Sequence, residues 1–180
     1  CLEIMENVSK GKINIYDEPL IKNMASYVYK MHIADNYFVN FADADPKITK
    51  PDGLMLYRFG QAIKDEKMVA MGQWAFSKFN QEIAVPGRHP MRVIENLISR
   101  NKIPNSAVNY QPEGTDYIAD IQVLTSRTKQ GLYLATHGGH NAESHNHNDV
   151  GDFIVYANGE PIIIDAGRGN YTARTFSAQR

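Results

Sequence analysis

Apolar side chains recur at helical spacing through the first hundred residues. In the stretch after Pro19 they fall every three or four positions, on one face of a helix, at Leu20, Ile21, Met24, Tyr27, Val28 and Met31. Asp17 and Glu18 before this proline are typical of a helix start, and the helix is expected to end near residues 34–36. Further helices are predicted over residues 53–64, 67–80 and 91–100. Short connections between such helices favour antiparallel helical hairpins.

The pattern changes over residues 101–116, where two prolines and a glycine interrupt any periodicity. After it, short apolar runs indicate strands, which we predict over residues 118–125, 131–136, 150–157 and 161–165. Asn158-Gly159 between the last two is a strong signal for a β-hairpin turn. The sequence therefore predicts an α+β chain, with a helical domain over residues 1–105 and an antiparallel β domain over residues 106–180.

Composition narrows the possible functions. The 180 residues carry 19 Lys and Arg against 20 Asp and Glu, and this balance gives no electrostatic reason to expect nucleic acid or an anionic membrane as a partner. The single cysteine, Cys1, excludes an internal disulfide, and no apolar run approaches the roughly 20 residues that span a bilayer. The chain begins at a cysteine and ends at Arg180 without a stop signal, so we expect a piece of a longer protein.

Four of the six histidines lie within residues 137–147. His145 and His147 are two positions apart, which puts both on one face of an extended strand. That arrangement supplies two ligands to one metal ion, or one ligand and one catalytic imidazole. Asp165 directly follows an isoleucine run, where a carboxylate at the edge of a core is costly unless a metal or hydrogen bonds satisfy it.

Strand geometry restricts a shared metal site. A turn at residues 158–159 pairs Asp165 with about Asp152, five residues from His147, which is about 16 Å in a straight strand. His147 and Asp165 can therefore share a metal only if the chain bends near Gly151, where a glycine permits a bulge. The alternative is that the histidines and asparagines of this segment form caps and turns without any catalytic role.

A longer series of motifs resembles the heparinase II/III-like polysaccharide lyases. The motifs are Ser144-His145-Asn146-His147-Asn148-Asp149-Val150-Gly151, Asn158-Gly159, Ile163-Ile164-Asp165, Gly169-Asn170-Tyr171-Thr172 and Thr175-Phe176-Ser177. The stretches 31–35 and 37–41 are also similar to the family. The resemblance implies the end of an (α/α) helical toroid followed by an antiparallel β-sandwich, as part of a larger chain.

The resemblance also implies roles for the predicted site residues. A structural Zn²⁺ is expected on His147 and Asp165, with a third ligand beyond residue 180, and the bend before Gly151 follows from this. His145 is expected to face the substrate cleft as a catalytic residue. The tyrosine and the Asn or His that complete the family's active site are expected upstream of this chain.

The implied activity is β-elimination on a polysaccharide that contains uronic acid, such as a glycosaminoglycan or alginate, by a bacterial enzyme in the periplasm or outside the cell. The partner is then an acidic polysaccharide, with no nucleic acid and no membrane, and the fragment alone is expected to be inactive. Two alternatives stay open at this point. One is a non-catalytic carbohydrate-binding or surface protein that keeps the lyase shell, and the other is a metal-dependent hydrolase.

Overall fold

The chain folds into two compact units. The computed structural model describes residues 2–49, 51–79, 90–104, 112–142 and 150–170, and also residues 108, 110, 147, 172, 173 and 177. The helical unit consists of Cys1–Met31 with Thr49–Pro112, and the sheet unit consists of His32–Ile48 with Glu113–Arg180. This mixture of helices and an antiparallel sheet agrees with the predicted α+β class. The segment 32–48, which lies inside the predicted helical domain, belongs to the sheet unit.

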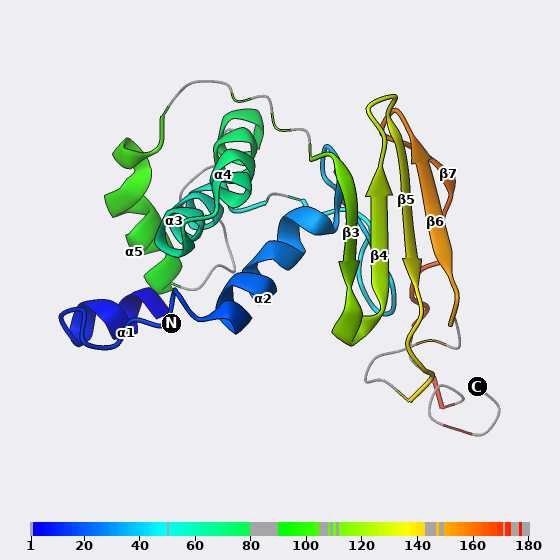
Figure 1. Ribbon diagram of the computed structural model, residues 1–180, viewed down its shortest axis with the longest axis horizontal. Helices are drawn as coiled ribbons and strands as arrows, with labels where there is room; N and C mark the ends of the chain where they lie inside the picture. Colours follow the sequence, from blue (N-terminus) through cyan, green and yellow to red (C-terminus); the bar gives the residue numbers. More distant parts are fainter. Residues whose placement is uncertain are drawn as a thin grey trace. The chain divides into compact units, whose positions relative to one another are not determined.

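The helical unit follows the periodicity of the sequence closely. Its helices are α1 (Leu2–Val8), α2 (Pro19–Lys30), α3 (Gly53–Ile63), α4 (Glu66–Phe79) and α5 (Pro90–Ser99), with a 3₁₀ turn at Arg100–Lys102 (Figure 1). The predicted helix after Pro19 was drawn too long, because α2 ends at Lys30 and His32 already begins a strand. The described part of this unit contains no helix long and apolar enough to cross a membrane.

Helices α3 and α4 pack backbone against backbone. A Cβ on Gly53 would lie 2.4 Å from the backbone nitrogen of Phe76, and one on Gly72 would lie 2.4 Å from that of Tyr57. Only glycine permits this approach. The Asp52 carboxylate caps α3 by accepting a hydrogen bond from the backbone N–H of Met55 at 3.1 Å. The backbones of these two helices therefore lie in direct contact within the helical unit.

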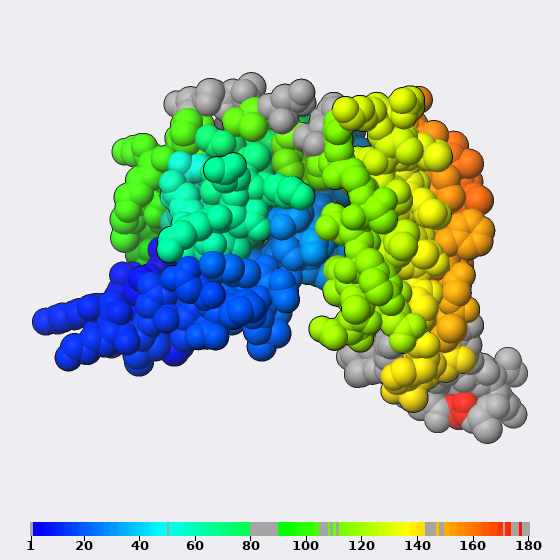
Figure 2. Space-filling model, viewed as in Figure 1, coloured from blue at the N-terminus to red at the C-terminus, as the bar shows by residue number. Residues whose placement is uncertain are grey.

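The sheet unit contains a five-stranded antiparallel meander. Its strands are β3 (Gly114–Ile118), β4 (Val123–Arg127), β5 (Leu132–His137), β6 (Phe153–Ala157) and β7 (Glu160–Ile163), in the order β3-β4-β5-β6-β7. Figure 2 shows them as neighbouring bands that change from green through yellow to orange. Asn158 and Gly159 both have positive φ, +52° and +84°, so the predicted hairpin turn between β6 and β7 is confirmed.

One predicted strand is wrong. Residues 118–125 do not form a single strand, because a 3₁₀ turn at Ala119–Ile121 and a left-handed Gln122 (φ +49°) reverse the chain. As a result Ile118 pairs with Val123, and β3 extends backwards to Gly114. Strand β3 has little sequence signal because its side chains are mostly exposed and show no apolar alternation.

The segment 32–48 packs on one face of this sheet. It contains the short hairpin β1 (His32–Ala34) and β2 (Tyr37–Phe38). The Tyr37 ring lies 5.6 Å from the Tyr156 ring of β6, and the Arg127 guanidinium of β4 donates hydrogen bonds to the backbone carbonyls of His32 and Ile33. Side chains on this face are buried, including Ala135 and Ile154. Tertiary packing on the sheet therefore determines the conformation of residues 32–48.

Candidate functional site

The histidine-rich segment begins at the end of β5. His137, the last residue of that strand, is buried, and its ring stacks on Phe41 with the centroids 5.6 Å apart. Its backbone N–H donates to the Asp152 carbonyl at 3.0 Å, and its carbonyl accepts from the Gly151 N–H at 2.8 Å. The backbone of His137 therefore hydrogen-bonds to the residues just before β6, and its ring packs on Phe41 of the segment 32–48.

Gly151 changes the direction of the chain just before β6. Its φ is +88°, in the left-handed region that favours glycine, and residues 150 and 151 form a turn. The turn is compatible with the predicted bend, but most of the segment before it lies outside the described residues, so the bend stays a prediction. The register irregularity lies elsewhere, between Val155 and Tyr156 of β6.

His147 contacts a residue that the sequence pattern did not single out. Its Nε2 atom lies 3.4 Å from Oδ1 of Asp43, a distance at the long end of a hydrogen bond. The side chain of Asp43 is 19% exposed and that of His147 is 30% exposed, so both are partly shielded from water. Asp43 comes from the loop after β2, in the segment that packs on the sheet. The structure therefore places a carboxylate beside one of the two predicted site histidines.

Asp165 lies just after β7 and is 9% exposed. Its carboxylate accepts a hydrogen bond from the backbone N–H of Gly167, which has φ +74°. This bond offsets part of the cost of burying the carboxylate. The expectation that Asp165 is held at the edge of a core agrees with this position.

The residues fit a zinc site in chemical type, but the described part of the chain does not gather a complete set. Imidazole nitrogen and carboxylate oxygen are ordinary zinc donors. Among the described residues, no three His, Cys, Asp or Glu side chains come together in a geometry that could hold a metal ion. His147 lies beside Asp43, and Asp165 accepts a hydrogen bond from Gly167. Shared zinc binding by His147 and Asp165 stays a prediction, and His145 lies outside the described residues.

The other histidines have structural surroundings or lie outside the described chain. His32 is buried in β1, and its Nε2 lies 3.0 Å from the Asp35 carbonyl, which agrees with a structural role. His140 is exposed, and its Nδ1 accepts from the Ala142 N–H at 3.2 Å. His89 lies in a stretch that the structure does not describe.

Comparison with protein families identifies the sheet-bearing part of the chain. Residues 122–180 match the family described as Heparinase II/III-like, C-terminal, and this range contains His145, His147 and Asp165. Comparison with curated proteins gives no match. Members of the heparinase II/III-like family are polysaccharide lyases, and their substrates are polysaccharides. Residues 122–180 are therefore similar to the C-terminal domain of the heparinase II/III-like family.

Proposed function

We propose that this chain is part of a lyase that cleaves a uronic-acid-containing polysaccharide by β-elimination. The observation that carries the proposal is the family match over residues 122–180, which contains the three residues to which the sequence assigned chemistry. The near-neutral charge of the whole chain does not oppose an acidic substrate, because substrate contacts depend on the local charge around the site.

The reaction requires three things of the protein. A base removes the proton on the carbon next to the uronate carboxyl, and the electron pair forms a carbon–carbon double bond. The bond to the glycosidic oxygen then breaks, and this oxygen takes up a proton as it leaves. The carboxylate must be neutralised so that negative charge is stabilised while the proton departs. Imidazole suits a proton-transfer role because its ordinary pKa is close to neutrality. We assign this role to His145.

We assign His147 and Asp165 to a structural zinc site, with Asp43 as a positioning residue. A ligating histidine commonly donates its other ring N–H to a carboxylate, which fixes the tautomer and the ring orientation. The 3.4 Å separation between Nε2 of His147 and Oδ1 of Asp43 suits this arrangement. Zinc, when bound, would be held by His147 and by Asp165, which follows β7. No step of the elimination is assigned to it.

The lyase assignment is tested with the full-length protein that contains this chain. Formation of unsaturated uronate is followed by ultraviolet absorbance on heparan-type glycans, alginate and other uronates. We expect His145→Ala to fold normally and to lose about 100-fold or more of the elimination rate, which is the ordinary contribution of a general acid or base. His140→Ala is the matched control, because His140 is an exposed histidine of the same segment, and it should keep wild-type activity. Full activity in His145→Ala would remove this residue from the mechanism.

The zinc assignment is tested by metal content and zinc affinity, independently of activity. His147→Ala should lose bound zinc, and Asp43→Asn should weaken zinc affinity by about 10–100-fold, as expected for a residue that orients a ligand. Asp45→Asn is the control for Asp43, because Asp45 forms an exposed ion pair with Arg168 at 3.3 Å. Unchanged zinc content in His147→Ala would exclude it as a ligand. Equal affinities of Asp43→Asn and Asp45→Asn would exclude Asp43 as a positioning residue.

A further inference from the structure

Arg168 places an exposed guanidinium beside the candidate site. It lies three residues after Asp165, inside the family-matched range, and its Nη2 atom lies 3.3 Å from Oδ2 of Asp45. Asp45 in turn lies two residues after Asp43, whose carboxylate lies beside His147. Two residues of chain span at most about 7 Å and three at most about 11 Å, so these short steps keep the guanidinium near both proposed zinc ligands.

The ion pair that holds Arg168 is open to exchange. The side chains of Arg168 and Asp45 are 54% and 66% exposed. An exposed ion pair contributes little free energy, because water competes for both groups. A ligand carboxylate can therefore replace Asp45 at little cost, and the planar guanidinium can offer two parallel N–H groups to its two oxygens.

The other cations in the described part of the sheet unit have different surroundings. Arg127 donates its guanidinium hydrogen bonds to two backbone carbonyls. Lys129 lies in the turn before β5, at the end of that strand about 20 Å from the start of the histidine-rich segment. Lys47 extends over the Tyr37 ring, 4.5 Å from its centroid. Of the cations described in this unit, Arg168 is thus the best placed to meet an anion at the candidate site.

Carboxylates near Arg168 act against the binding of an anion. Asp43 and Asp45 lie in one loop, and Asp165 lies three residues before Arg168. The proposed zinc site would offset the charge of Asp165, and Asp43 lies beside the imidazole of His147. Asp45 keeps its charge and competes directly for the guanidinium. Its removal should therefore strengthen the binding of an anionic ligand.

We propose that Arg168 is a specificity-determining residue that binds a uronate carboxylate of the polysaccharide. The inference rests on the proposed lyase function and deepens it by naming the group that recognises the acidic substrate. Without substrate the guanidinium pairs with Asp45, and in the complex it moves to the sugar carboxylate. That carboxylate belongs to a sugar beside the one that reacts, since the group that neutralises the reacting carboxylate is expected upstream of this chain.

The test compares charged and uncharged forms of the same probe with the full-length protein. The probes are an alginate tetrasaccharide, a heparan-type tetrasaccharide and the methyl esters of both, which lack the carboxylate charge. Dissociation constants are measured by titration calorimetry in a His145→Ala background, so that the probes survive, and KM and kcat are measured with His145 present.

Arg168→Gln should weaken the binding of a uronate probe about tenfold or more, because two charge-assisted hydrogen bonds are lost. Arg168→Lys should recover only part of this loss, since a lysine keeps the charge and not the fork. The methyl esters should bind all three proteins equally. In turnover the loss should appear in KM with kcat nearly unchanged, as for a group that binds substrate and transition state alike.

Asp45 distinguishes a binding role of Arg168 from a structural one. Asp45→Asn should tighten uronate binding about threefold or more, because the guanidinium loses its competitor and a nearby negative charge is removed. A purely structural ion pair predicts that Arg168→Gln and Asp45→Asn change affinity in the same direction. Thermal unfolding of both variants establishes that they are folded.

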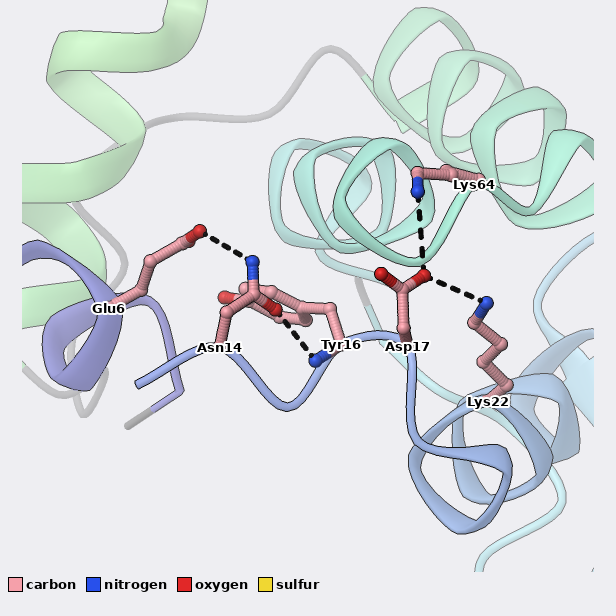
Figure 3. Close-up of polar contacts among 6 residues, drawn as sticks. All are labelled: Glu6, Asn14, Tyr16, Asp17, Lys22 and Lys64. Atoms are coloured by element: carbon pink, nitrogen blue, oxygen red, sulfur yellow. Dashed lines mark hydrogen bonds and ion pairs between the residues drawn. The ribbon is translucent and has the colours of Figure 1, made fainter. Parts of the chain in front are cut away.

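Exposed lysines in ion pairs supply the matched controls. Lys22 and Lys64 both contact Oδ1 of Asp17 in the helical unit, at 3.1 and 3.4 Å (Figure 3). Lys129 belongs to a similar exposed pair in the sheet unit. Lys64→Gln and Lys129→Gln remove one positive charge each and should change uronate affinity by less than about twofold. A loss in either control as large as that in Arg168→Gln would reduce the effect to net charge and overturn the assignment.

Further outcomes separate this inference from the lyase assignment. Wild-type affinity in Arg168→Gln, weaker binding in Asp45→Asn, or no binding of either uronate probe by the protein with Arg168 in place would overturn the role of Arg168. Binding that depends on Arg168 without formation of unsaturated uronate would contradict the lyase assignment alone, and would leave Arg168 as the residue that recognises the carboxylate.

Discussion

The glycine contacts between α3 and α4 predict that one added methyl group destabilises the helical unit. A Cβ on Gly72 would lie 2.4 Å from the backbone nitrogen of Tyr57, 2.7 Å from its Cα, and 2.9 Å from the carbonyl oxygen of Gly53. Favourable contacts between such atoms need about 3.5 Å, so Gly72→Ala must push the helices apart by about 1 Å. The neighbouring atoms belong to the backbone and cannot rotate away.

Two effects of opposite sign set the size of the change. Alanine is more favourable than glycine inside a helix by about 1 kcal/mol. Overpacking costs about 1–3 kcal/mol, and a clash with backbone atoms belongs at the upper end of that range. The free energy of unfolding should therefore fall by about 2 kcal/mol, which lowers the melting temperature of a chain of this size by about 4–8 °C.

The assay is thermal unfolding followed by circular dichroism in the far ultraviolet, with urea unfolding as a second measurement. Gly169→Ala is the control, because its added Cβ would meet no atom within 4 Å and its φ is not positive. That variant should change the free energy of unfolding by less than about 0.5 kcal/mol. A melting temperature of Gly72→Ala equal to or above the wild-type value would refute the inference that the two helix backbones touch here.

Two further predictions concern the segment on the sheet and the buried tyrosine. Arg127→Lys should speed amide hydrogen exchange in residues 32–48 about tenfold or more. The reason is that a lysine cannot make the paired bonds to two carbonyls, and each charge-assisted bond contributes about 1.5–3 kcal/mol. The control is Arg168→Lys, which alters an exposed ion pair and should leave exchange nearly unchanged. Burial, Glu3 and Glu6 raise the pKa of Tyr16 from 10.0 to about 12 in the folded chain. The unfolded chain therefore loses the phenol proton at lower pH than the folded chain does. As a result, the stability that the neutral phenol supplies falls as the pH rises from about 10 to 12. Tyr16→Phe should remove that part of the loss in alkaline unfolding curves, and an unchanged curve would contradict the raised pKa.

The sequence predicted those elements whose signals are local. Apolar spacing located α3, α4 and α5 to within a residue or two at most ends, and Asn158-Gly159 located the turn between β6 and β7. It missed α1, which buries no residue and so leaves little pattern. It also missed β1 and β2, because these short strands form through contacts with a sheet that is distant in sequence.

In the candidate site, too, local sequence signals were informative and long-range contacts could not be predicted. Local sequence drew attention to His147 and Asp165, and the structure agrees with a buried carboxylate at Asp165. Asp43 could not be found from spacing, because it lies 104 positions from His147 and the two meet only when residues 32–48 fold onto the sheet. Two residues so far apart in the sequence show no periodic pattern that would indicate their contact.

The path of the chain has a consequence for how this protein can be divided or recombined. The backbone passes between the helical and sheet units three times, at residues 31–32, 48–49 and 112–113. A crossover near residue 112 would take Phe41, Asp43 and the carbonyls of residues 32 and 33 from one parent, and their partners His137, His147 and Arg127 from the other. The sheet is therefore not an autonomous module that can be transplanted by its C-terminal sequence. A functional graft must carry residues 32–48 with it.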